Sequence, residues 1–226
     1  MHFIQKHILR ELAQHASRRY GELQPQRIPS NTFSYHLRKL IAGGFVKKVR
    51  DGYALTSKGV HLSTTVHFED YSVRIQPKIV TLIACRDAAG RFLMYRRAKQ
   101  PFLGMIGFPY GKVHLGETVA KAAARELAEK CGTHATLAHK GIIYLLVTDA
   151  AGEIIAHMLA HIFLGTAPRQ EGAPAPAGFG TTHWMTRQAL AEAACMPGVF
   201  DVLRIATSRA RGLAFEELAF AFAHDA

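Results

Sequence analysis

The sequence predicts a small α+β domain followed by an α/β sandwich with a mixed sheet. Early in the chain, apolar residues recur at helical spacing and one short hairpin follows, whereas after Pro77 the pattern changes to successive strand-like runs separated by turn signals. The 226 residues, 49% of them hydrophobic, are enough for two packed cores. We therefore expect one domain at residues 1–66, a linker at 67–77 and a second domain at 78–226.

Positive charge is concentrated in the first of these domains. Residues 1–66 hold 11 Lys and Arg against 3 acidic residues, a net charge of +8, whereas residues 67–226 hold 17 against 14. Such an asymmetry indicates two modules with different partners. The excess of cations in the first domain favours a polyanion as its partner.

The composition also predicts a protein without a membrane span that stays in the cytoplasm. No apolar run approaches the roughly 20 residues that a membrane-spanning helix needs. Charged residues interrupt the N-terminal segment, which therefore lacks the apolar core of a secretory signal. The cysteines Cys85, Cys131 and Cys195 are odd in number and widely spaced, so we expect buried thiols rather than disulfides or zinc ligands.

Two helices and a hairpin are expected in the first domain. The first helix covers about the first fifteen residues, and its apolar residues at helical spacing are Ile4, Ile8, Leu9 and Leu12. The second begins at Ser30 as a hydroxyl N-cap and ends at Gly43-Gly44. Its apolar stripe consists of Phe33, Leu37, Leu40 and Ile41. The stretch FVKKVRDGYALT then predicts a hairpin with a type I′ turn at Asp51-Gly52.

Polar and basic side chains lie on the exposed face of the second helix and on the hairpin. They are Asn31, Tyr35, Arg38, Lys39, Lys47, Lys48 and Arg50. These residue types contact phosphates and base edges. The segment SNTFSYHLRKLIAGGFVKKVRDGYALTSKG resembles the recognition helix and wing of bacterial winged-helix transcription regulators, which implies binding to double-stranded DNA. Because winged helices also serve as protein-binding modules, a homodimer contact stays open as an alternative.

The second domain is predicted as two hairpins that flank one helix. The first hairpin turns at the segment DAAG of residues 87–90, and the second at the DAAG of residues 149–152. The helix between them runs from Thr118 to Lys130. Residues 167–181 are rich in Pro, Gly and Ala and predict a long loop, and helical segments are expected to close the chain at 187–194 and 199–210.

The segment from Gly111 to Thr133, GKVHLGETVAKAAARELAEKCGT, carries the chemistry. It resembles the Nudix box, and the matching positions are Gly111, Glu117, Arg125, Glu126, Leu127, Glu129 and Gly132. The resemblance extends over about residues 76–210 and implies a Nudix α/β/α sandwich. It also implies hydrolysis of a pyrophosphate linkage in a nucleoside diphosphate derivative with Mg²⁺ or Mn²⁺.

Metal-assisted hydrolysis needs oxygen ligands that converge, because hard divalent cations prefer oxygen. Glu126 and Glu129 are three residues apart, so on a helix they project from nearly the same face. The resemblance implies that both bind the metal, together with the backbone carbonyl of Tyr110. It assigns Glu117 and Arg125 to a structural pair that orients the loop against the helix. A further acid from outside the box is expected, with two candidates, Glu171 and Glu153.

Lys130 departs from the family pattern, which has a metal-binding glutamate at this position. Three arrangements of its ammonium are compatible with the sequence. The ammonium pairs with Glu126 in the favourable Glu-before-Lys orientation, it contacts a phosphate of the ligand directly, or it points outward while the remaining acids hold the metal. The sequence does not choose among them.

Two functions are compatible with these observations. The first is a Nudix hydrolase with an attached DNA-binding-like module, which the intact Glu126 and Glu129 favour. The second is a transcription regulator whose Nudix domain senses a nucleotide such as an ADP-ribose-type metabolite with weak or no hydrolysis, which Lys130 favours. Both predict a nucleotide-derived small molecule as the partner.

Overall fold

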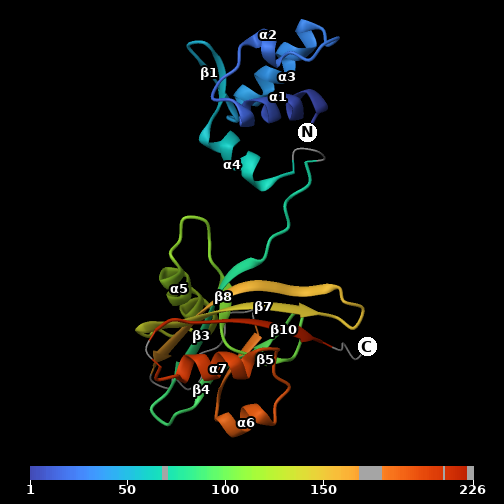
Figure 1. Ribbon diagram of the computed structural model, residues 1–226. Helices are drawn as coiled ribbons and strands as arrows, with labels where there is room; N and C mark the ends of the chain where they lie inside the picture. The colour runs from blue at the N-terminus through green and yellow to red at the C-terminus, as the bar shows by residue number, and fades with distance from the viewer. Residues whose placement is uncertain (68–70, 168–179, 211, 223–226) are drawn as a thin grey trace. The chain divides into compact units, whose positions relative to one another are not determined.

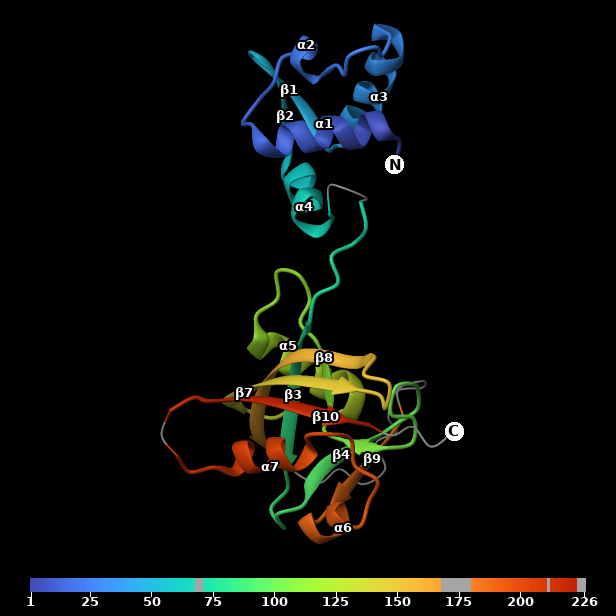
Figure 2. The same ribbon diagram turned by 45° about the vertical axis from the view of Figure 1, so that its right-hand side comes forward.

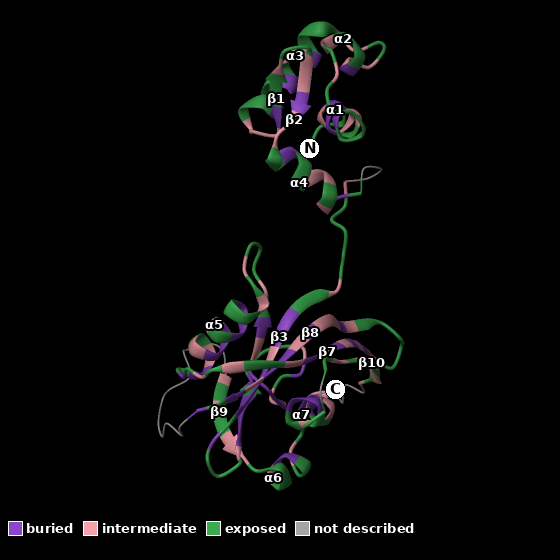
Figure 3. Cartoon of the chain, turned by 60° about the vertical axis from the view of Figure 1, so that its left-hand side comes forward, coloured by how far each residue is buried: buried purple, intermediate pink, exposed green. Residues whose placement is uncertain are grey.

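The computed structural model describes residues 1–67, 71–167, 180–210 and 212–222, and it divides into two compact units (Figure 1). The first unit covers residues 1–75 and the second residues 76–226. Each unit has its own buried core (Figure 3). Among the described residues, no helix is both long and apolar enough to cross a membrane.

The first unit is a small α+β fold of helices and one two-stranded sheet, as predicted. Its elements are α1 (Phe3–Gln14), α2 (Tyr20–Leu23), α3 (Ser30–Ala42), β1 (Val46–Val49), β2 (Gly52–Leu55) and α4 (Ser57–Thr65). The apolar stripe of α1 packs against Phe33, Leu37 and Leu40 of α3 and is fully buried. The spacing of apolar residues therefore determines which faces of α1 and α3 meet.

Several local predictions for this unit were wrong. Ser30 is the first residue of α3 rather than its N-cap, which is Pro29, and the Ser30 hydroxyl hydrogen-bonds Gln24 instead. Ile41 is 37% exposed and does not belong to the core stripe. The hairpin pairs Val49 with Gly52, so its turn is Arg50-Asp51. Neither turn residue has a positive φ, which a type I′ turn requires.

Helix α4 was not predicted. The Thr56 hydroxyl caps it by accepting a hydrogen bond from the backbone N–H of Gly59 at 3.1 Å. Its nine residues include three β-branched residues, Val60, Thr64 and Thr65, and few buried side chains, so the apolar pattern that marks a helix is weak.

The second unit contains an eight-stranded mixed sheet, which confirms the predicted fold class. The strands are β3 (Lys78–Arg86), β4 (Phe92–Arg97), β5 (Ile106–Gly107), β6 (Tyr110–Lys112), β7 (Leu137–Thr148), β8 (Ile154–Thr166), β9 (Gly180–Met185) and β10 (Ala214–Ala221). Their order is β10-β7-β8-β3-β4-β5, with β6 paired to β3 and β9 to β4. The β7–β8 and β3–β4 pairs are antiparallel, whereas β3–β8 and β10–β7 are parallel.

Helices cover both faces of this sheet (Figures 1 and 2). Helix α5 (Val119–Cys131) packs on one face, and α7 (Val199–Thr207) packs on the other, with α6 (Arg187–Ala191) beside β9. Alternate residues of β3 belong to different cores, since Ala84 faces α7 whereas Ile83 and Cys85 face α5. This alternation follows from the two-residue period of a strand.

The C-terminal part of the second unit differs from the prediction. Helix α7 ends at Thr207 rather than at residue 210, and the chain then returns as β10, which was not predicted. The short strands β5 and β6 were also missed as sheet members, because two or three residues carry too little alternation to identify a strand. Most of the predicted loop at 167–181 lies outside the described residues, at 168–179.

Candidate functional site

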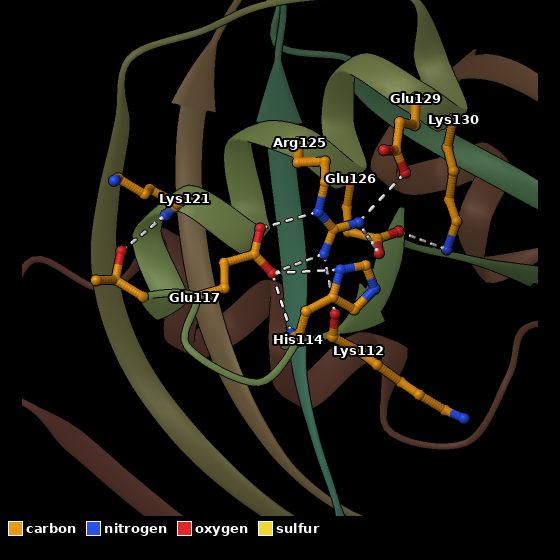
Figure 4. Close-up of polar contacts among 9 residues, drawn as sticks. Lys112, His114, Glu117, Lys121, Arg125, Glu126, Glu129 and Lys130 are labelled. Atoms are coloured by element: carbon orange, nitrogen blue, oxygen red, sulfur yellow. Dashed lines mark hydrogen bonds and ion pairs between the residues drawn. The ribbon is translucent and has the colours of Figure 1, made fainter. Parts of the chain in front are cut away.

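Helix α5 positions most of the box side chains. The Thr118 hydroxyl caps its first turn by accepting from the Lys121 backbone N–H at 3.3 Å, and Gly132 ends it in the left-handed conformation, φ +59°. One face of α5 buries the apolar residues Ala123 and Leu127 against the sheet. The adjacent side carries Arg125, Glu126, Glu129 and Lys130 along the edge of β6 (Figure 4).

Arg125 joins α5 to the segment before it. Its guanidinium donates two hydrogen bonds of 2.9 Å to the carboxylate of Glu117 and one of 3.1 Å to the backbone carbonyl of Lys112. The Glu117 carboxylate also accepts from the backbone N–H of His114 at 3.1 Å. These bonds, above all those from Arg125, lower the pKa of Glu117 to about 2. The arrangement suits the structural role that the sequence predicted for Glu117 and Arg125.

Glu126 lies in a tight space against Gly111. A Cβ atom on Gly111 would stand 1.7 Å from the carboxylate carbon of Glu126, so only glycine leaves room for this side chain. Glu126 is 6% exposed. Its Oε1 accepts from Arg125 at 2.7 Å, and its Oε2 is 3.0 Å from the ammonium of Lys130. Both carboxylate oxygens are thus paired with a cation.

The Lys130 ammonium lies inside the site. It donates to the backbone carbonyl of Tyr110 as well as pairing with Glu126. Its nitrogen is also 4.8 Å from the centre of the Tyr110 ring and 6.0 Å from that of Tyr95. With 12% of its side chain exposed, Lys130 does not point outward, so that alternative was wrong. The pairing with Glu126 is the arrangement observed.

Glu129 is the more accessible carboxylate of the box. Its side chain is 54% exposed and its Oε2 is 3.2 Å from the guanidinium of Arg125. Arg125 therefore contacts Glu117, Glu126 and Glu129 together (Figure 4). The structure thus places Glu129 next to Glu126, as the helical spacing predicted, but an arginine stands between their charges.

Arg97 is a site residue that sequence reasoning missed. This buried guanidinium donates to the hydroxyl of Tyr110 and to the backbone carbonyls of Lys99 and Gln100 at 2.8 and 3.0 Å. It holds the Tyr110 side chain beside Lys130. The only signal was a basic residue at the end of a predicted strand, which is also typical of surface arginines.

Apart from Glu117, the charged side chains described above line a cleft of about 520 Å³ in the second unit. Its cationic side chains are Lys78, Arg97, Lys99, Lys112, Arg125 and Lys130, and its carboxylates are Glu126 and Glu129. Aromatic rings of Tyr95, Phe102 and Tyr110 complete the wall. Glu153 is exposed in the turn between β7 and β8 and is not among the lining residues, and Glu171 lies outside the described residues.

The residues around Tyr110 and Glu126 do not fit a divalent cation. Mg²⁺ and Mn²⁺ prefer several oxygen ligands, and here the Lys130 ammonium already occupies the space between the Tyr110 carbonyl and the Glu126 carboxylate. In the part of the chain that the structure describes, no three His, Cys, Asp or Glu side chains converge as a metal site would require. A second positive charge at this point would meet both Lys130 and Arg125.

The predicted nucleic-acid face is exposed in the first unit. All seven of its residues are exposed: Asn31, Tyr35, Arg38, Lys39, Lys47, Lys48 and Arg50. A groove of about 500 Å³ runs beside α3 and is lined by Tyr20, Asn31, Ser34, Leu37, Arg38, Ile41 and Tyr53. Next to it, the Lys39 ammonium stacks 4.7 Å above the Tyr35 ring. Polar, cationic and aromatic groups are thus brought together on one helix.

The mixed sheet between two layers of helices, with the box on α5 facing a cationic cleft, defines the class of α/β sandwich proteins. Within that class, the NUDIX domain family matches residues 76–202, and the chain belongs to the Nudix family. Residues 4–66 match a domain of unknown function, DUF7347.

Individual proteins also resemble the chain. It is 31% identical to the Isopentenyl-diphosphate Delta-isomerase of Nocardia farcinica (strain IFM 10152) over 135 residues, which are 55% of this chain and 76% of that protein. Among solved structures, the NUDIX domain of Shewanella oneidensis NrtR complexed with ADP ribose has a TM-score of 0.50 at 15% identity, covering 58% of this chain and 86% of that one. A NUDIX hydrolase from Nitrosomonas europaea has a TM-score of 0.49 at 16% identity, covering 69% and 86%.

Proposed function

We propose that this protein is a DNA-binding regulator whose Nudix domain binds a nucleotide-derived ligand that contains a diphosphate. The observation that carries the ligand of this proposal is the charge of the cleft, which is lined by six cationic side chains and only two carboxylates. Both carboxylates are already paired with cations. The excess of positive charge is suited to the phosphates of a ligand.

The rest of the cleft supports a ligand with a flat apolar part. Tyr95, Phe102 and Tyr110 line the same cavity as the cations, so a base or a similar group would meet an aromatic wall, in which Tyr110 is the most exposed ring. The relatives point to the same chemistry, because the NrtR domain was crystallised with ADP ribose and the Nocardia protein is named for isopentenyl diphosphate. A diphosphate is common to both compounds.

The first unit supports double-stranded DNA as the second partner. Residues 1–66 carry a net charge of +8, and the polar face of α3 is exposed beside a groove. In a winged-helix arrangement, α3 would enter the major groove and the β1–β2 hairpin would contact the adjacent backbone. Arg38 and Lys39 would then supply contacts to phosphates or base edges.

DNA binding is tested with the full-length protein and a fragment from the region upstream of its own coding sequence. Fluorescence anisotropy should show affinity that falls steeply between about 50 and 200 mM salt, because lysines and arginines displace counterions. The double variant Arg38→Ala, Lys39→Ala should bind about tenfold more weakly, and its salt slope should fall by about 1 for each phosphate that is no longer neutralised. Arg10→Ala, on the exposed side of α1, is the control.

Two results would contradict the regulator. DNA affinity that does not depend on salt, or that is equally weakened in the Arg10 control and the Arg38, Lys39 variant, would count against α3 as the binding face. If ADP-ribose binds the second unit but leaves the DNA affinity unchanged over its saturating range, the two units are not coupled. In that case the ligand does not regulate DNA binding.

Hydrolysis is the second candidate function, because Glu126 and Glu129 line the same cleft with Arg125 between them. It is tested with nucleotide sugars, dinucleotides and nucleoside triphosphates in the presence of Mg²⁺ or Mn²⁺. The regulator predicts tight binding of one compound without turnover. Release of phosphate-containing products that is lost in Glu126→Gln, but kept in the exposed control Glu192→Gln, would favour the hydrolase instead.

A further inference from the structure

We infer that the ammonium of Lys130 is a built-in cation that takes the place of a divalent metal in ligand binding. The inference deepens the proposed function and rests on it, since it concerns how the same cleft holds a diphosphate. Lys130 contacts two oxygen atoms that a metal ion would need, the backbone carbonyl of Tyr110 and one oxygen of Glu126. The cation of this site is therefore part of the polypeptide chain.

Lys130 and Tyr110 form a matched pair. The Tyr110 ring lies beneath the ammonium at 4.8 Å, and the Tyr95 ring adds a second face at 6.0 Å. Aromatic faces attract an ammonium through their quadrupole, and the attraction is stronger where water is excluded. Arg97 donates to the Tyr110 hydroxyl and so keeps that ring in place. Two oxygens and two rings thus contact one ammonium, whose side chain remains 12% exposed.

The ammonium still has capacity for a ligand. A lysine has three N–H donors, of which two are directed at the Tyr110 carbonyl and the Glu126 carboxylate. The third is left for a ligand oxygen, and Lys130 lines the open cleft together with Arg125 and Lys112. Ammonium groups are common binders of phosphate. A diphosphate would thus be held by fixed nitrogen cations that need no Mg²⁺.

A metal titration without any ligand tests the inference directly. Mn²⁺ is added to the full-length protein, and the free ion is followed by electron paramagnetic resonance. The wild type should show no site in the cleft. Lys130→Glu should gain one that binds Mn²⁺ at least about tenfold more tightly than any residual binding by the wild type, because the substitution changes the local charge by two units and adds a carboxylate. Adding Glu126→Gln to Lys130→Glu should remove the gained site.

A matched control and a second variant separate local from global effects. Lys121 lies on the same helix but does not line the cleft, so Lys121→Glu should leave Mn²⁺ binding unchanged. Lys130→Met keeps an unbranched side chain, one atom shorter than that of lysine, and removes its charge. Fluorescence of Trp184, the single tryptophan, which packs with the α5 core, verifies that each variant is folded.

A second experiment measures ligand affinity by calorimetry. Its probes are inorganic pyrophosphate and ADP-ribose, and each is titrated once with EDTA and once with Mg²⁺. Wild-type affinity should differ less than about twofold between the two conditions, and Lys130→Met should bind about tenfold more weakly in EDTA. An increase of tenfold or more with Mg²⁺ in the wild type would overturn the inference. So would a wild-type Mn²⁺ site as tight as that of Lys130→Glu, or no gain in Lys130→Glu.

Failure of the proposed function has a different signature. If neither probe binds in either condition, the cleft does not take a diphosphate, and the proposed ligand class is wrong. The Mn²⁺ titration still decides whether Lys130 excludes a metal from the space between Tyr110 and Glu126, because it needs no ligand.

Discussion

The replacement of Gly111 by alanine tests the packing on which the whole site depends. The added Cβ would lie 1.7 Å from the carboxylate carbon of Glu126 and 2.0 Å from each of its oxygens. Ordinary contact begins near 3.4 Å, so the carboxylate has to move by roughly 1.5 to 2 Å. Such a movement breaks its pairs with Arg125 at 2.7 Å and with Lys130 at 3.0 Å.

The size of the effect follows from these two pairs. Hydrogen bonds to charged groups contribute about 1.5 to 3 kcal/mol each, and water recovers part of this when the displaced carboxylate becomes exposed. We expect Gly111→Ala to lower the free energy of unfolding of the second unit by about 3 kcal/mol. For a domain of this size, the corresponding fall in Tm is about 6 to 12 °C.

Trp184 makes the measurement specific, because the only tryptophan of the chain lies in the second unit. Its fluorescence during thermal unfolding reports that unit alone. Gly107→Ala is the matched control, since its Cβ would meet only the flexible end of Met196, with the sulfur at 2.8 Å, and should cost less than about 1 kcal/mol. Equal losses in the two variants would refute the assigned role of the Glu126 contacts.

Other substitutions and reagents test the helix packing, the Glu117–Arg125 pair and the buried thiols. Leu127→Ala, which removes a fully buried side chain between α5 and the sheet, should cost about 3 kcal/mol by chemical denaturation, and a loss below about 1 kcal/mol would contradict that packing. Because the folded-state pKa of Glu117 is lowered to about 2, its stabilising contribution is present above its ordinary value of 4.5 and is lost as the pH falls toward 2. The Tm of Glu117→Gln should therefore depend less on pH in this window than that of the wild type, and parallel curves would speak against the pair. Burial raises the pKa of Cys85 to about 11 and of Cys131 to about 12, so iodoacetamide at pH 8 should leave both unmodified in the native protein, as mass spectrometry can check, and label the less buried Cys195 first.

Local patterns in the sequence predict a large part of this fold. Helix α5 begins after Thr118 and ends before Gly132, because a hydroxyl cap and a left-handed glycine act within a few residues of the backbone that they terminate. The β7–β8 hairpin likewise turns at the segment of residues 149–152, where Asp149 accepts from two backbone N–H groups. The spacing of the box also places Glu126 and Glu129 side by side.

What the sequence determined by itself is thus the class of fold, the helix that carries the box and the order of its charged side chains. The tertiary structure alone decided that β10 returns to pair in parallel with β7, that Gly111 makes room for Glu126 and that the Lys130 ammonium turns inward. The physical reason is the distance along the chain over which each kind of interaction acts. Caps, turns and periodicity act over a few residues, whereas the direction of the Lys130 side chain depends on Tyr110 and Tyr95, which belong to strands that only folding brings beside α5.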